Sequence, residues 1–488
     1  MRSMLLLAAT LAASARAQAP PKGPPAAEAL LRYKPKPYVP PELSPEGPLA
    51  PADAPAIRIV GPEGRDVPVL ARPSRVAPLV GGLAPGARVA VTGLAIGDAG
   101  SCTRWYALGT SAYVCATHTR PAAEADGNPY LPSREDSALP WDYVMVALPE
   151  SESLPLFSSR EQMDAQTEPE RVLLKGDTVA VEKAVRIGDE SWWLAVDGRL
   201  LPTRGTFRLK EKSIWAGVAV APSELPLGWI TRARAPVYSA PSGGHVSEKL
   251  ARRTRVAILE ESGAGRALRL RIGDGRWVSA RDVNEVRVTP RPAGPAPEPP
   301  ARWIDVDVGE QTLVLYEGET PVWATLVSSG RAVKTPRGDY PVWAKVAAVT
   351  MKNPPYEDKP YFVHRVPWVL FFQAHNAIHG AYWHDEFGRA KSHGCINLSP
   401  RDAHHVFEWA TPALPDGWTG VRPTNLFESV LVHVRDSSLR RPHKQERPIG
   451  PPDREEERLK LEVAEQRRAS GTPTPASPKA PGGQTTAP

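Results

Sequence analysis

Three times before residue 290 the chain repeats one order of short stretches in which apolar and polar residues alternate, and this repeat limits the fold more than any other feature. Alternation with a period of two is typical of β-strands that bury one face of a sheet. About five such strands can close into a small barrel, so the pattern predicts three small β-barrels in tandem. The matching stretches are VPVLARPS, GARVAVTG and RWYALGTSAYV, then LPLFSSRE, GDTVAVEK and SWWLAVDGRLL, then APVYSAPS, RTRVAILE and LRLRIGDGRWV.

Proline-rich segments separate these copies from the rest of the 488-residue chain. Residues 18–56 have few large apolar side chains and are predicted to form an extended tether. Residues 289–300, TPRPAGPAPEPP, are predicted to be a linker to a further domain. Residues 436–488 become charged and then low in complexity, which predicts a tail without a packed core.

The first residues predict export. Residues 1–17 combine a basic start, an apolar run and small residues at Ala15 and Ala17, which is typical of a signal peptide. The run is too short to span a bilayer, and no later stretch is apolar enough to do so. We therefore expect no membrane span and a mature protein in the periplasm or cell envelope.

The charge of the chain is only mildly basic. The formal net charge is +6, and without residues 1–17, which hold two arginines and no acid, it is about +4. Basic side chains are scattered among acidic ones, which indicates a solvated surface rather than a binding stripe. The sequence therefore predicts no nucleic-acid partner.

The three cysteines divide into a pair and a single residue. Cys102 and Cys115 flank a stretch that reads as a hairpin, where two cysteines can meet disulfide geometry, and an exported protein tolerates such a bond. Cys395 is left over, and an unpaired thiol in an oxidising compartment needs an explanation.

The surroundings of Cys395 predict a nucleophile. His379 lies sixteen residues earlier, far enough for the chain to leave one strand and return beside it. An imidazole that takes the thiol proton, or pairs with a thiolate, raises the reactivity of sulfur and lowers the pKa of the thiol. Gly380 and Gly394 lie beside the two residues, and amides around Gly394 and Cys395 could face a developing oxyanion.

The stretch SHGCIN, preceded at this distance by HG, resembles the L,D-transpeptidase catalytic domain, a YkuD-like family of cysteine enzymes that act on peptidoglycan. The resemblance covers residues 301–435 and includes IDVDVGEQTLVLYEGE, VSSGRAVKTPRGDYPV and PYFVHRV. SPRDAHHVFEWA reads as a short helix after the cysteine, with Ser399 as N-cap, Pro400 in the first turn and Asp402 completing a capping box.

The resemblance implies roles for individual residues. Cys395 would be the nucleophile and His379 the base, and Gly380 would offer a carbonyl to the imidazole. Cys395 would attack the third-residue carbonyl of a stem tetrapeptide, form a thioester and pass the acyl group to an amine. No cofactor and no metal are implied. The remaining implied residues support the cysteine loop or bind substrate: Ser392, His393, Gly394 and Asn397 for the loop, and Tyr361 and Arg389 for the substrate.

The repeated part resembles bacterial SH3-like modules, at residues 57–120, 142–210 and 228–288. In exported proteins such barrels often bind cell-wall peptides, and tryptophans could supply stacking faces, although large aromatic residues usually carry core packing. The tryptophans concerned are Trp105, Trp192, Trp193 and Trp277. The whole chain is therefore predicted to be mainly β, with three such barrels followed by the catalytic domain.

Several alternatives stay open. The thioester could pass to water, which would make the protein an L,D-carboxypeptidase or a hydrolase that frees protein from peptidoglycan. His364 could replace His379 as the base. His375 and His379 have the spacing of a helical zinc pair, although the flanking residues favour a strand. A wall-binding scaffold with an inert catalytic domain is the remaining alternative.

Overall fold

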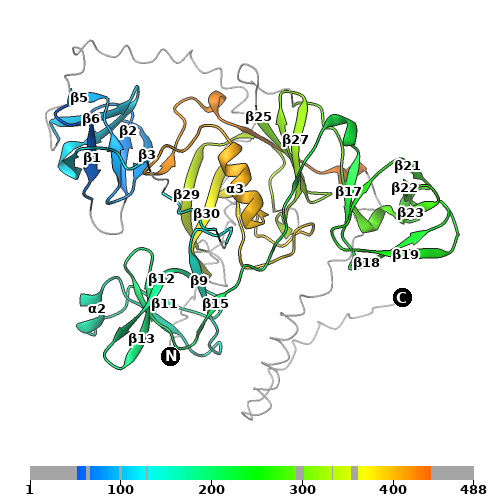
Figure 1. Ribbon diagram of the computed structural model, residues 1–488, viewed down its shortest axis with the longest axis horizontal. Coiled ribbons are helices and arrows are strands. Elements are labelled where there is room, and N and C mark those ends of the chain that lie inside the picture. Colours follow the sequence, from blue (N-terminus) through cyan, green and yellow to red (C-terminus); the bar gives the residue numbers. More distant parts are fainter. Residues whose placement is uncertain are drawn as a thin grey trace, which may run out of the picture. The chain divides into compact units, whose positions relative to one another are not determined.

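The structure is a computed structural model that describes residues 52–61, 66–97, 102–127, 130–135, 137–292, 302–331, 334–352 and 361–440. The predicted signal peptide, nearly all of the tether, and most of the linker and tail lie outside these residues. The described residues form mainly β-strands, with the α-helices α2 (Arg160–Asp164) and α3 (Pro400–Trp409) (Figure 1). None of the described helices has the length and apolar character to cross a membrane.

Each repeated segment forms its own set of strands. The first contains β1 (Ala56–Ile59), β2 (Val67–Leu70), β3 (Leu79–Leu83), β4 (Arg88–Ala90), β5 (Gly93–Ile96), β6 (Arg104–Gly109), β7 (Ala112–Cys115) and β8 (Thr119–Ala122). The second contains β9 (Asp142–Val146), β10 (Leu154–Leu156), β11 (Arg171–Leu173), β12 (Thr178–Ile187), β13 (Glu190–Ala195), β14 (Leu200–Pro202) and β15 (Thr206–Leu209). The third contains β17 (Leu227–Ile230), β18 (Arg234–Tyr238), β19 (Val246–Ala251), β20 (Arg255–Ala257), β21 (Glu260–Ser262), β22 (Arg269–Gly273), β23 (Arg276–Ser279) and β24 (Val283–Val286).

The first and third segments share one order of strand pairing, and the second shares part of it, with β10 and β11 in a sheet of their own. In the first, β1 pairs with β4 and β8, and the other strands follow the order β5-β6-β7-β2-β3. In the third, β17 pairs with β20 and β24, and the order is β21-β22-β23-β18-β19. In the second, β9 pairs with β12 and β15, while the ten-residue strand β12 takes the place of both the fourth and the fifth strand. The repeated sequence pattern therefore corresponds to a repeated pairing scheme.

The tryptophans of these segments are packing residues. Trp105, Trp192, Trp193 and Trp277 are each exposed by 9% or less. Trp105, Trp193 and Trp277 therefore offer no open stacking faces, whereas Trp192 also lines a groove of the second segment. Trp192 and Trp193 are consecutive on β13 and point to opposite faces of the sheet, so alternation alone does not account for the burial of both.

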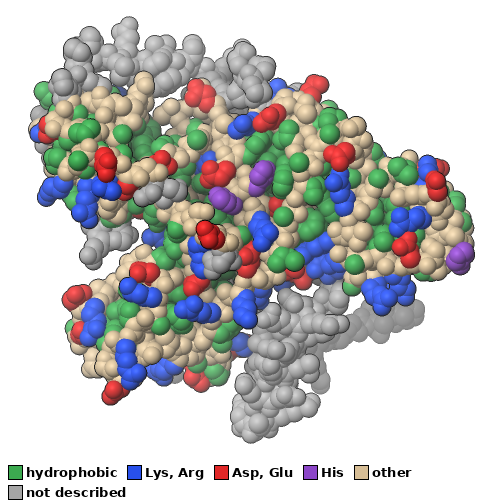
Figure 2. Space-filling model, in the orientation of Figure 1, with side chains coloured by type: hydrophobic (Ala, Val, Ile, Leu, Met, Phe, Trp, Pro, Cys, Tyr) green, Lys and Arg blue, Asp and Glu red, His purple; other side chains and the backbone are tan. Residues whose placement is uncertain are grey.

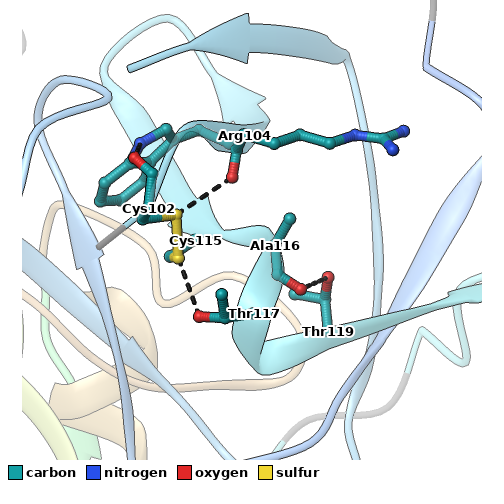
Figure 3. The surroundings of a disulfide bond; sticks show 7 residues. Cys102, Arg104, Cys115, Ala116, Thr117 and Thr119 are labelled. Atoms are coloured by element: carbon teal, nitrogen blue, oxygen red, sulfur yellow. Dashed lines mark hydrogen bonds between the residues drawn. A yellow bond between two sulfur atoms is a disulfide. The ribbon is translucent and has the colours of Figure 1, made fainter. Parts of the chain in front are cut away.

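A disulfide joins Cys102 to Cys115 in the first segment, with an S–S distance of 2.01 Å (Figure 3). Cys115 is paired with Trp105 across the β6–β7 hairpin, and the indole of Trp105 donates to the carbonyl of Cys102 at 3.0 Å. The bond therefore ties the loop before β6 to the end of β7. Cys395 is a free cysteine, as the sequence predicts.

The predicted catalytic domain, here called the catalytic part (residues 302–435), has two sheets. The first has the order β16-β27-β26-β25-β34-β28, and its edge strand β16 comes from the connector between the second and third segments. The second sheet places β30 between β29 and β31, with β32 beside β31 and β33 beside β29. The bounds are β16 (Val218–Ala219), β25 (Arg302–Asp307), β26 (Thr312–Glu317), β27 (Thr320–Leu326), β28 (Gly338–Pro341), β29 (Ala344–Lys352), β30 (Phe362–Gln373), β31 (Asn376–Gly380), β32 (Ile396–Leu398), β33 (Trp418–Val421) and β34 (Leu431–Arg435).

The second sheet continues into the first two repeated segments. Strand β33 pairs with β3, and β30 pairs with β12 at Val363 and Thr178.

Lys, Arg, Asp and Glu side chains are interspersed on the face shown in Figure 2, as a solvated surface requires.

Removal of the disulfide is expected to destabilise the first segment. Replacing both Cys102 and Cys115 with alanine removes a cross-link between residues that lie 13 positions apart in the sequence. Loss of this constraint on the unfolded chain should lower the free energy of unfolding by about 2–3 kcal/mol. Urea unfolding, monitored by limited proteolysis within residues 56–122, measures the change in the free energy of unfolding. Cys395→Ala is the matched control, and an equal shift in that variant would contradict the expectation.

Candidate active site

Two neighbouring strands bring His379 and Cys395 together. Strand β31 carries His379 next to its end, and β32 begins at Ile396, directly after Cys395. The two strands are parallel, and His379 pairs in register with Asn397. The chain thus leaves β31 and returns beside it, as the sequence predicts.

The loop before β32 has a fixed shape around Gly394. Gly394 has φ +152°, and a Cβ there would lie 2.4 Å from Oδ1 of Asn376, so only glycine fits. Its amide donates to Oγ of Ser392 at 3.1 Å, while its carbonyl accepts from Oγ1 of Thr335 at 2.8 Å. Ser392 Oγ also donates to the carbonyl of Cys395. The Gly394 amide is therefore engaged within the loop and does not face an oxyanion, contrary to the expectation.

His379 is buried and neutral. Its Nδ1 lies 3.1 Å from the carbonyl of Gly380, so Nδ1 carries the hydrogen and Nε2 has a free lone pair. The imidazole is 2% exposed, and burial lowers its pKa to about 4 because a charged ring is poorly solvated there. Above about pH 5 the ring can act as a base.

Cys395 is also neutral. Burial raises the pKa of its thiol, and the backbone of Ala377 offsets this effect only in part. The thiol donates to the carbonyl of His375 at 3.8 Å, and within the described residues no hydrogen bond joins it to the His379 ring. The expected lowering of the thiol pKa is therefore wrong for this structure, because burial raises the pKa and the uncharged His379 ring does not oppose this effect.

Asn397 belongs to a buried hydrogen-bond chain that the sequence does not reveal. Its Nδ2 lies 2.9 Å from Nε2 of His384, whose Nδ1 accepts from the amide of Glu386 at 3.1 Å. An imidazole that accepts at Nδ1 carries its hydrogen on Nε2, so the Asn397 amide must turn its oxygen toward His384. This orientation also gives a partner to Oδ1, which is otherwise buried without one among the described residues.

The remaining predicted residues contact groups other than the Cys395 sulfur. His393 is exposed, and its ring stacks with that of Tyr361 at a centroid distance of 6.0 Å. Arg389 directs its guanidinium to Glu386 and to the carbonyl of Thr231 in the third segment. The structure thus places Tyr361 beside the cysteine loop and turns Arg389 toward the third segment.

Two alternatives are excluded by position. His364 is 1% exposed, and its Nε2 contacts Asp197 at 2.9 Å while Nδ1 accepts from Ala180, so it packs against the second segment. His375 lies in the turn between β30 and β31, and His379 lies in β31, so the two do not share a helix. No group of three or more potential metal-binding side chains occurs within the described residues.

The helix after the cysteine is capped as predicted only in part. Ser399 accepts from the amide of Asp402 at 3.1 Å, and Pro400 lies in the first turn. Asp402 does not complete a capping box, because its carboxylate accepts from the amide of Gly217 at 2.7 Å and from Oγ1 of Thr325 at 2.5 Å. Burial raises its pKa to about 6. Asp402 thus ties the helix to strand β27 and to the connector.

The thiol of Cys395 is expected to react slowly with iodoacetamide at neutral pH. Only the thiolate reacts, and burial raises the pKa of this thiol, so the rate should rise through pH 9 without an earlier plateau. At pH 7 we expect a rate several-fold below that of glutathione. Mass spectrometry of the non-reduced protein gives the rate. A plateau that begins below pH 8 would contradict a neutral thiol and imidazole.

Comparison with known proteins identifies the domain that carries this site. Residues 301–425 match the family model of YkuD, the L,D-transpeptidase catalytic domain. None of the curated proteins compared with the chain matches it.

Similar solved structures include a mutant Enterococcus faecium L,D-transpeptidase, with 24% identity over 28% of this chain and 49% of that chain, at TM-score 0.22. The catalytic domain from E. faecium L,D-transpeptidase has 24% identity over 28% of this chain and 100% of that one, at TM-score 0.22. A Mycobacterium smegmatis L,D-transpeptidase has 19% identity over 34% of this chain and 66% of that chain, also at TM-score 0.22. The chain spans about half the length of the first of these proteins. The match of the family model shows that residues 301–425 are similar to the L,D-transpeptidase catalytic domain.

Proposed function

We propose that the protein is an exported peptidoglycan L,D-transpeptidase that forms cross-links in the cell wall. The observation that carries this function is the placement of His379 on strand β31 and of Cys395 directly before the neighbouring parallel strand β32, within the residues that match the family model. Cys395 is the nucleophile in this proposal, and His379 is the base. The inert scaffold is not favoured, because both residues and the cysteine loop are in place.

The first half-reaction starts from two neutral groups. Sulfur attacks the third-residue carbonyl of a stem tetrapeptide while Nε2 of His379 takes the thiol proton. The bond to the terminal D-alanine then breaks, and the imidazolium gives its proton to the departing amine. A thioester on Cys395 and a neutral His379 remain.

The second half-reaction transfers the acyl group. An amine of a second stem attacks the thioester, His379 takes the amine proton, and the thiol leaves with that proton. Because the Gly394 amide is engaged by Ser392, the Cys395 amide is the oxyanion donor in this proposal. Tyr361, beside His393 at the rim of the site, is a substrate contact.

Export is part of the proposal. It is supported by the signal-peptide pattern of residues 1–17 and by the disulfide between Cys102 and Cys115. Disulfides form and persist in oxidising compartments such as the bacterial periplasm. The substrate, a wall polymer, lies in the same compartment.

We further propose that the three repeated segments are SH3-like modules and that the second contacts the wall. The recurring pairing scheme supports the first statement. The second rests on a groove of about 330 Å³ in the segment 142–210. Phe157 and Trp192 contribute tilted rings 6.0 Å apart, and Glu190 and Arg204 add one charge of each sign. Such a groove suits a peptide with apolar and charged groups.

The chemistry is tested with tetrapeptide and pentapeptide stems in separate incubations. We expect the tetrapeptide to yield a dimer lighter than two stems by one D-alanine, and the pentapeptide to be spared because the pocket must fit the leaving residue. Cys395→Ala should lower this activity by about 10³-fold or more with the fold retained, since the covalent route is lost.

The product masses separate the alternatives. A tripeptide without a dimer would indicate L,D-carboxypeptidase activity. Covalent addition of a carbapenem to Cys395 is a companion measurement. The proposal would be overturned if the protein turned over neither stem and Cys395→Ala kept full activity on any peptidoglycan substrate.

Wall contact is tested by co-sedimentation of the full chain with purified peptidoglycan. Phe157→Ala should lower the bound fraction about twofold to fivefold, because it removes one wall of the groove. Phe207→Ala is the matched control, since Phe207 lies in the same segment, is 43% exposed and does not line the groove. Equal binding of both variants would contradict the role of the groove.

A further inference from the structure

The loop between the two site residues contacts the third repeated segment. We define the connecting loop as residues 381–394, which link His379 on β31 to Cys395 before β32. We propose that Arg252, Arg253 and Asn284 of the third segment are positioning residues that hold this loop. The proposal deepens the proposed function and rests on it, because it assigns to a segment outside 301–425 a share in placing the nucleophile.

Two arginines bind one end of the loop. Arg253 donates to both carboxylate oxygens of Asp385, from Nη1 to Oδ2 at 3.1 Å and from Nη2 to Oδ1 at 2.5 Å. Arg253 Nη2 and Arg252 Nη2 both donate to the carbonyl of Asp385, at 3.0 and 3.1 Å. Arg252 Nη2 also donates to the carbonyl of Phe387 at 3.1 Å. Bidentate pairs of this kind fix orientation as well as distance.

The backbone conformation of Arg253 indicates that the placement of this residue is important for the contact with the loop. Arg253 has φ +70°, a left-handed conformation that is unfavourable for a residue other than glycine. Its guanidinium lies 5.3 Å from the ring of Trp215, in the connector. The side chain thus passes between the connector and the loop, and burial lowers the pKa of the neighbouring Arg252, as expected for a desolvated guanidinium.

A third contact holds the middle of the loop. Asn284 is fully buried, and its Nδ2 donates to the carbonyl of Gly388 at 2.9 Å. Gly388 has φ +93°, and a Cβ there would lie 3.1 Å from the same amide nitrogen. The turn of the loop at Gly388 is therefore shaped against the third segment.

The loop passes this placement on to the cysteine. Beyond Asp385, the amide of Glu386 binds His384, and His384 binds Asn397, the residue in register with His379. On the other side, the carbonyl of Arg389 accepts from Oγ of Ser328 at 2.7 Å. The contacts form a continuous chain from the third segment to the two strands of the site.

The test uses the full chain with Arg253→Ala, Asp385→Ala and the double variant. We expect kcat on the tetrapeptide stem to fall about tenfold or more in each single variant, with KM changed less than about twofold, because the substrate does not touch these residues. The double variant should be no worse than either single one, since both remove the same contact. Arg253→Lys should keep a higher kcat than Arg253→Ala, because lysine keeps the positive charge.

Arg255→Ala is the matched control. It removes the same charge two residues away, where Arg255 pairs with Glu224 at 2.7 Å at the surface and does not contact the loop. Its kcat should equal that of the unchanged protein. Additive losses in the double variant, or equal kcat in Arg253→Ala and Arg255→Ala, would overturn the proposal. If Arg253→Ala does not fold, Asp385→Ala carries the test from the side of the loop.

A second readout separates this proposal from the proposed function. The rate of Cys395 alkylation by iodoacetamide needs no substrate, and it should change at least about threefold in Arg253→Ala and not in Arg255→Ala. If the unchanged protein turns over neither stem, the proposed function fails and the alkylation rates alone decide the positioning role. A lower melting temperature with an unchanged alkylation rate would show a structural role only.

Discussion

A buried core shared by three parts of the chain is the constraint on which the site depends. Trp215 from the connector, Trp229 from the third segment, and Trp303 and Phe387 from the catalytic part belong to one hydrophobic cluster. Burial of a side chain such as Phe387 contributes about 1.5–3 kcal/mol. Phe387 lies in the connecting loop, so the loop cannot leave this core without exposing it. The third segment therefore shapes the site through packing as well as through hydrogen bonds.

The site combines a buried base with a loop of fixed shape. Desolvation keeps His379 neutral with its Nε2 lone pair free, and the Gly380 carbonyl fixes the tautomer. Thr335 and Ser392 fix the Gly394 backbone from two sides. Side-chain packing and hydrogen bonds thus set the protonation state and the backbone geometry before any substrate is present, which is the preorganisation that acyl transfer uses.

Local and periodic features could be predicted from the sequence, whereas long-range contacts could not. The three strand repeats, the free Cys395 and the Ser399 cap follow from alternation, cysteine pairing and capping preference, each of which acts over a few residues. The Arg253–Asp385 pair joins residues 132 positions apart, and no local pattern specifies it. The sequence predicts a lowered pKa for the Cys395 thiol, whereas the structure gives a raised one, because a local sequence pattern does not show that the thiol and His379 are desolvated. Asp402 fits a capping box by spacing, but a buried threonine and a connector amide bind its carboxylate instead.

The raised pKa of Cys395 bears on how a free thiol persists where the disulfide of the first segment is stable. Oxidation and disulfide exchange proceed through the thiolate, so a neutral thiol resists both. The same property would make the residue a poor nucleophile if its proton had to leave before attack. In the proposed mechanism a neutral His379 removes this conflict, because the proton moves only as sulfur bonds to carbon. The neutral state thus protects the partly buried thiol at rest, and the proposed reaction then depends on how closely the connecting loop holds sulfur to the imidazole.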